Sequence, residues 1–109
     1  MTLKEKLVYS VPEFDFKEFE NDDDFIIICF FAIFIANNIN NPDIANRCAD
    51  CVNWVYTTKH PEHQAILEQI ALTLFDENLY EETFITLLHT GVQKHFEKSI
   101  AMWRQGSVQ

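Results

Sequence analysis

Apolar and polar positions separate most sharply in the first third of the chain. Twelve apolar residues follow one another from Phe25 to Ala36, directly after an acidic stretch, 13–24, that holds seven carboxylates and one lysine. Such an apolar run has to be buried, whereas carboxylates have to stay in contact with water. We therefore predict a central helix over about 23–38, buried all round, with aspartates capping its positive end. A strand is the alternative, because Ile and Phe favour sheets, but no comparable run exists to pair with it.

Four further segments carry helical patterns. A serine followed by an early proline predicts a short helix over 10–20, and Asn41-Pro42-Asp43 is a second helix start. Apolar residues recur every three or four positions in three later segments, which are 42–58, 61–76 and 79–105.

Gly91 interrupts the last of these segments. The apolar stripe keeps its phase across this glycine, so the segment is either two helices broken at Gly91 or one long helix bent there. We favour the break, because a glycine after His89-Thr90 makes a good helix end. Gly106 is predicted to end the last helix, and residues 1–10 and 106–109 are expected to fray.

These elements predict an all-α fold. We expect one domain, 1–109, in which five or six helices form a compact bundle around the central helix. A chain of 109 residues suits one domain and buries enough surface without a metal or a disulfide. Two glycines and three prolines are too few for a turn-rich β protein or a glycine-rich phosphate-binding loop.

The net charge of −9 restricts the partners. Phosphates repel such a chain, so we expect no direct binding to nucleic acid and none to a membrane. The apolar run, about 18 Å long as a helix, is too short for a hydrocarbon core of about 30 Å, and the N-terminus lacks a signal peptide. Three cysteines, an odd number, suit a reducing compartment. We therefore expect a cytoplasmic protein with a basic partner.

Two acidic clusters are candidate contacts for that partner. Aromatic residues lie between the acids, and aromatic anchors inside a polar rim are a common interface composition. Helix capping and solubility are the competing explanation. The residues that we predict to bind the partner are Asp15, Glu18, Asp22, Asp23, Glu77, Tyr80, Glu81 and Glu82.

One constellation has the residue types of a metal site. Cys48-x-x-Cys51 precedes His60-x-x-His63, and two thiolates with two imidazoles hold zinc tetrahedrally. The gap between the two pairs is shorter than usual in zinc fingers, and core packing is the better explanation of the cysteines. We predict no metal and no cofactor, and keep a zinc-stabilised helical module as an alternative.

Catalytic patterns are missing from the sequence. There is no nucleophile elbow of the GxSxG type, and His89 and His95, six positions apart, fall on different faces of a helix. The acids cluster at helix ends, whereas a catalytic pair needs a partly apolar pocket. We therefore expect a binding protein and not an enzyme.

Asn-Pro-Asp opens a helix at Asn41, a second helix ends near Leu74-Phe75-Asp76, and Glu81-Glu82 leads into Phe84-Ile85-Thr86-Leu87-Leu88. This organisation resembles the small helical immunity proteins of bacterial toxin–immunity pairs, such as those of contact-dependent growth inhibition systems. The resemblance implies no catalytic residues. It implies tight binding to one cognate toxin domain, often a basic nuclease, whose active site the immunity protein covers.

We therefore expect a stoichiometric inhibitor that neutralises a nuclease-type toxin by occluding its basic active-site surface. A phage-type acidic decoy, which mimics nucleic acid toward a defence complex, is the alternative of the same class. The zinc-stabilised structural module is the alternative from a different class.

Overall fold

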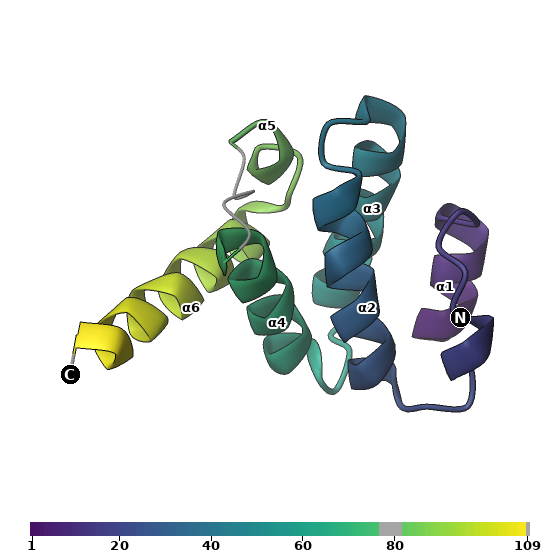
Figure 1. Cartoon of the computed structure of the whole chain (residues 1–109), viewed down its shortest axis with the longest axis horizontal. Helices are drawn as coiled ribbons and strands as arrows, with labels where there is room; N and C mark the ends of the chain where they lie inside the picture. The colour runs from purple at the N-terminus through teal and green to yellow at the C-terminus, as the bar shows by residue number, and fades with distance from the viewer. Residues whose placement is uncertain (77–81, 109) are drawn as a thin grey trace.

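Helices make up the regular structure of the chain (Figure 1). The computed structural model describes residues 1–76 and 82–108, the last three of these in backbone only. In chain order the elements are α1 (Leu3–Ser10), the short 3-10 turn η1 (Lys17–Phe19), α2 (Asp24–Asn37), α3 (Pro42–Thr57), α4 (His63–Asp76), α5 (Glu82–Ile85) and α6 (Thr90–Val108). No strand occurs among the described residues, and the predicted all-α bundle is confirmed.

The starts of α2 and α3 follow from their capping residues. The Asp23 carboxylate accepts a hydrogen bond from the backbone N–H of Ile26 at 3.0 Å, and Asn41 accepts one from Ile44 at 3.3 Å. Each bond satisfies a backbone donor that the first helical turn leaves free. Pro42 occupies the first turn of α3, where its missing N–H costs nothing. The predicted helices over 23–38 and 42–58 are therefore confirmed.

The N-terminal segment differs from its prediction. Residues 1–10, expected to fray, contain α1, and Ser10 ends this helix instead of starting one over 10–20. The reason is a capping box at the start of α1, in which Thr2 and Glu5 exchange side-chain-to-backbone hydrogen bonds. Leu3 and Leu7 are buried, which anchors α1 to the core.

The C-terminal segment is broken, but not at Gly91. The break lies at 86–89, where Asn53 of α3 donates to the carbonyl of Leu87 and accepts from the N–H of His89. Gly91 lies inside α6. A Cβ at this position would stand 2.1 Å from the Tyr56 hydroxyl, so the close packing of Tyr56 on α6 requires glycine here. Helix α6 continues to Val108, past Gly106, where the sequence predicted its end.

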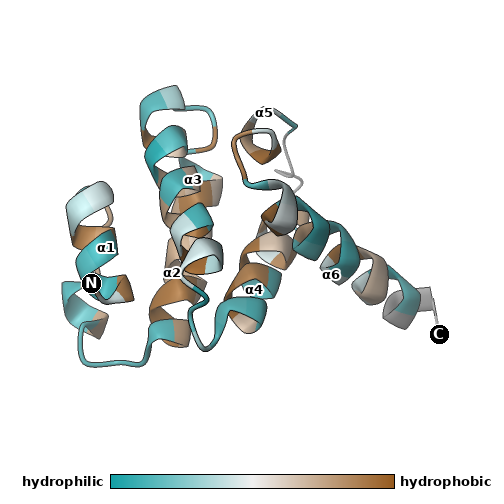
Figure 2. Cartoon of the chain, turned by 180° about the vertical axis from the view of Figure 1, so that it is seen from behind, coloured by the Kyte–Doolittle hydropathy of each residue, from teal (hydrophilic) through white to brown (hydrophobic). Residues whose placement is uncertain are grey.

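Helix α4 organises the packing, because it lies against both α2 and α6, while α1 packs on α3 (Figure 1). In Figure 2 hydrophobic colour dominates α2, whereas α3 and α6 alternate hydrophobic with hydrophilic turns. Within the described part of the chain, no helix is both long and apolar enough to cross a membrane.

Candidate partner-binding face

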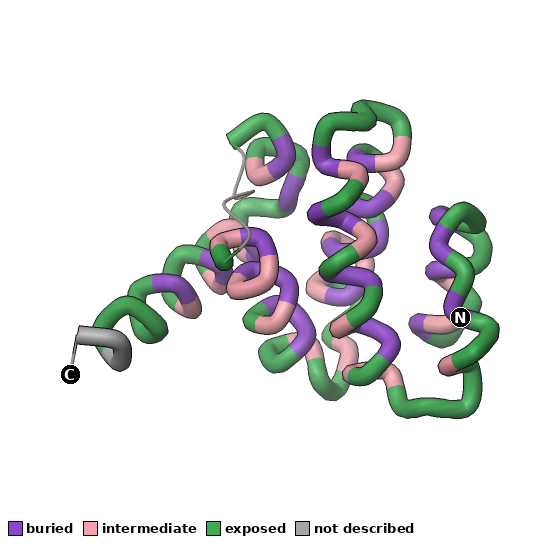
Figure 3. The backbone as a smooth tube through the Cα atoms, viewed as in Figure 1, coloured by how far each residue is buried: buried purple, intermediate pink, exposed green. Residues whose placement is uncertain are grey.

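Helix α2 is apolar on every side, yet one of its sides stays open. Ile26, Phe30 and Ile33 keep 40%, 39% and 51% of their surfaces exposed. Their spacing of four and three residues places them on one side of the helix, and we call them the open stripe. The opposite side is buried and consists of Ile27, Ile28, Phe31, Ala32, Ile35 and Ala36. Figure 3 shows exposed segments interrupting the buried ones along α2.

The acidic segment before α2 is attached to the open stripe. The ring of Phe19, in η1, stacks on Phe30 with centroids 4.1 Å apart and planes 4° from parallel. Phe14 and Phe16 are buried under the same segment. These aromatic side chains fix the path of the chain, so the neighbouring acids have a defined place beside the stripe.

A groove of about 410 Å³ continues the open stripe toward α4 and α6. The Phe75 and Trp103 rings meet edge to face in it, 5.8 Å apart, and Trp103 is about half exposed. The Gln69 amide donates a hydrogen bond to the Thr73 hydroxyl at 3.2 Å on the α4 side of the groove. The lining residues are Cys29, Ile33, Gln69, Leu72, Thr73, Phe75, Asp76 and Trp103.

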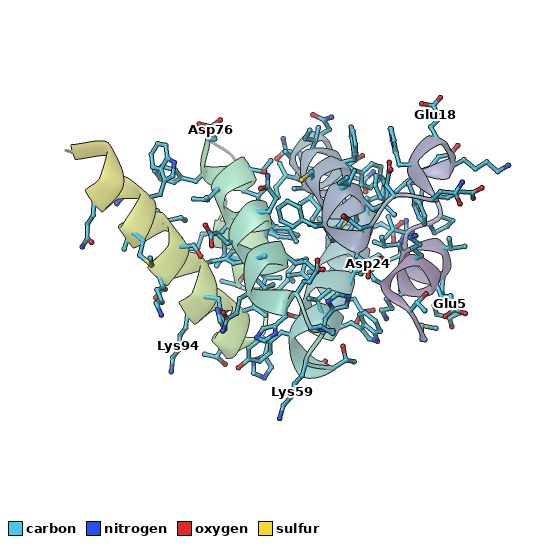
Figure 4. The ribbon with its side chains drawn as sticks, turned by 90° about the horizontal axis from the view of Figure 1, so that it is seen from below. Glu5, Glu18, Asp24, Lys59, Asp76 and Lys94 are labelled. Carbon is cyan, nitrogen blue, oxygen red and sulfur yellow. The ribbon has the colours of Figure 1, made fainter. Side chains whose placement is uncertain are left out.

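Three exposed acids flank this face. Glu18 and Asp22 precede the first turn of α2, and Asp76 ends α4 beside the groove. Their carboxylates form no hydrogen bond or ion pair with other described residues. Figure 4 shows Glu18 and Asp76 along one edge of the molecule, with Lys59 and Lys94 along the opposite edge.

Two other acids of the predicted set make hydrogen bonds to nearby backbone groups. Asp15 accepts a hydrogen bond from the Lys17 backbone N–H at 3.0 Å, and Asp23 caps α2. Glu82 is exposed at the start of α5. Glu77, Tyr80 and Glu81 lie outside the described residues.

Glu13 is held inside the molecule's own charge network. Arg47 of α3 binds its carboxylate with both guanidinium nitrogens, one of them at 2.7 Å, and also contacts Asp43 at 2.9 Å. The hydrogen bonds from Arg47 lower the pKa of Glu13 to about 2. This carboxylate ties the loop after α1 to α3, so it is not available to a partner in the way that Glu18 is.

The four residues of the zinc hypothesis are not brought together. Cys48 and Cys51 are buried in the core, where desolvation raises the pKa of Cys48 to about 12 and that of Cys51 to about 11. His60 lies 2.9 Å from the Asp24 carboxylate, and His63 contacts the His60 carbonyl. Among the described residues, no group of three or more His, Cys, Asp and Glu side chains has metal-binding geometry.

Two histidines instead lie against Tyr56 where α3, α4 and α6 meet, and a third packs on one of them. The ring centroids of His89 and His95 lie 5.0 and 5.9 Å from that of Tyr56, and His63 lies 5.9 Å from His95. Gly91 permits this approach, because its N–H donates to His89 Nδ1 at 3.0 Å while Tyr56 passes over it. The prediction that His89 and His95 lie on different faces of one helix is wrong, because His89 precedes α6 and both rings pack against Tyr56.

No protein-family model, curated protein or solved structure matches this chain. Its function is therefore inferred from the geometry of the open stripe and its surroundings.

The open stripe and Trp103 are the site residues that sequence reasoning missed. In the sequence, Ile26, Phe30 and Ile33 are indistinguishable from their buried neighbours, because all twelve residues of the run are apolar. One signal was available. A helix that is apolar all round needs neighbours on every side, and few helices remain in a 109-residue chain to supply them.

Proposed function

We propose that this chain is a stoichiometric protein-binding inhibitor that neutralises a basic, nuclease-type toxin domain by covering its active-site surface. The observation that carries the proposal is the open apolar stripe of α2, with exposed acids beside it that pair with no other described residue. Contiguous exposed apolar surface marks interaction sites, and an acidic rim steers a basic partner toward it. The resemblance to immunity proteins points to the same class of partner.

The apolar stripe favours a folded protein partner over the role of a nucleic-acid decoy. Phosphate mimicry needs negative charges at suitable spacing and makes no use of exposed isoleucine and phenylalanine side chains. A specific interface combines an apolar centre with a charged rim, as the stripe and the flanking acids do here. In this proposal the carboxylates act as contacts and carry out no chemical step.

The proposal is tested by co-expression with the protein encoded next to this chain's gene. We expect that neighbour to be toxic alone, to be harmless with this chain, and to form a 1:1 complex in solution. We expect affinity to fall as salt rises from about 0.05 to about 0.5 M, because screening weakens the charge contacts. A toxic neighbour that this chain neither binds nor neutralises contradicts the proposal.

A further inference from the structure

We infer that the groove between α2 and α6 receives one amphipathic helix of the partner, with an apolar side flanked by lysine or arginine. This inference rests on the proposed function, whose partner contact it specifies. The groove has an α2 wall with Cys29 and Ile33, a floor from α4, and Trp103 of α6 as its other wall. Helices pack side by side by placing side-chain ridges in such grooves.

The chemistry of the groove suits an amphipathic occupant. Ile33, Leu72, Phe75 and Trp103 contribute apolar surface, and an apolar ridge that covered them would remove exposed hydrophobic surface from water, at about 25 cal/mol per Å². The Asp76 carboxylate in the same lining has no hydrogen-bond or ion-pair partner among the described residues, so it can accept a hydrogen bond from a basic side chain.

The dimensions suit a helix. The open stripe from Ile26 to Ile33 covers two turns, about 10 Å along the axis. A partner helix would match it with apolar residues at i, i+3 or i+4, and i+7, the usual arrangement of helix-in-groove recognition.

The flanking acids predict the charges on that helix. Glu18 and Asp22 precede the amino end of α2, and Asp76, at the carboxyl end of α4, lines the groove together with Ile33, the last residue of the stripe. Basic residues at both ends of the partner's apolar ridge would therefore meet acids. A second copy of this chain fits poorly, because its own net charge of −9 would bring like charges together.

The test uses designed peptides, so it does not depend on a toxin. One helical peptide of about 15 residues carries leucines at i, i+4, i+7 and i+11 with lysines between them, and a control peptide has the same composition in scrambled order. Binding is followed by backbone NMR shifts of the labelled full chain. We expect the amphipathic peptide alone to bind, with the largest shifts at the open stripe and Trp103.

Matched variants locate the site. Ile33→Ser on α2 and Trp103→Ala on α6 should each weaken peptide binding at least about 10-fold, as expected for central contact residues. Val8→Ser on α1 should leave it unchanged, although Val8 is exposed to a similar degree (60% against 51% for Ile33). Circular dichroism confirms that each variant folds. Because the two variants lie on opposite walls of the groove, a local distortion at one position would not explain a loss of binding in both.

Several results would overturn the inference. They are equal binding of the scrambled peptide, equal losses for Ile33→Ser and Val8→Ser, and a wild-type dimer that Ile33→Ser dissociates. A chain that binds the peptide at the stripe but fails to neutralise its neighbour contradicts the proposed function alone. Neutralisation that persists in both groove variants contradicts this inference and leaves the proposed function standing.

Discussion

The two sides of α2 are made of the same kinds of residue and have opposite surroundings. Ile27, Ile28 and Phe31 are covered by the rest of the bundle, whereas Ile26, Phe30 and Ile33 face outward beside a groove. Hydrophobicity therefore does not decide which side of this helix is core. The positions of α4 and of the segment before α2 decide it.

This difference separates stability from recognition within one helix. Side chains on the inner side contribute chiefly to the free energy of folding, because unfolding exposes all of their surface. Side chains of the open stripe are already partly exposed, so they contribute less to the free energy of folding. A partner that covered them would bury the remaining apolar surface and gain binding free energy. Substitutions on the two sides should therefore separate folding from binding.

The largest expected effect is on the inner side. Phe31→Ala should lower the free energy of unfolding by about 3–5 kcal/mol, because it leaves a cavity in the core. Phe30→Ala should cost about 1 kcal/mol, chiefly its stacking on Phe19. Urea unfolding of both variants measures the difference. Equal losses would show that the open stripe is part of the core in solution.

The cysteines should report the same contrast through their reactivity. Cys29 lines the groove and is partly exposed, although desolvation also raises the pKa of its thiol. Cys48 and Cys51 are buried, and desolvation raises their pKa values to about 12 and about 11. A maleimide should modify Cys29 about 100-fold faster than the core thiols, which react only through opening of the fold. Mass spectrometry of the native protein over time follows each site. Similar rates at all three would contradict the burial difference.

The contact between Gly91 of α6 and Tyr56 of α3 is a close-packed site away from the open stripe. Gly91→Ala should destabilise the fold by about 1 kcal/mol, because the new methyl group displaces Tyr56. In a Tyr56→Ala background the same change should stabilise by about 0.5–1 kcal/mol, through helix propensity. Thermal unfolding of the four proteins in this cycle measures the coupling. An equal change in stability for Gly91→Ala in both backgrounds would exclude close contact between residue 91 and Tyr56.

The smallest effect distinguishes an internally paired acid from an open one. The folded-state pKa of Glu13, about 2, is below its ordinary value of 4.5, so its contribution to stability is present above about pH 4.5 and is lost as pH falls toward 2. Glu13→Gln should therefore lower the urea midpoint at pH 7, and the difference from wild type should fade between pH 4.5 and 2. Glu18→Gln, at an exposed position without a partner among the described residues, should leave the urea midpoint at pH 7 unchanged.

Local signals predicted the parts of the fold that depend on capping. Asp23 and Asn41 placed the starts of α2 and α3, because their side chains bond to backbone groups a few residues away. Helix α1 was missed although its capping box is equally local. Thr2 and Glu5 stand so close to the chain end that fraying was the stronger expectation.

The remaining features depend on contacts between distant segments. Asn53 makes hydrogen bonds to the break at 86–89, and Tyr56 packs against α6 at Gly91; both residues come from α3. The candidate site was predicted only in its acids, Glu18 and Asp22. Its apolar half was not, since no local pattern in a uniformly apolar helix tells which side the other helices cover.

The most direct test of the central claim, that the open stripe binds the partner, compares two single substitutions in one titration. Calorimetry would measure the affinity of the proposed partner domain for the wild type, Ile33→Ser and Val8→Ser. We expect Ile33→Ser to lose at least about 10-fold in affinity and Val8→Ser to match the wild type, with all three unfolding at similar urea concentrations. Full affinity in Ile33→Ser would contradict the claim.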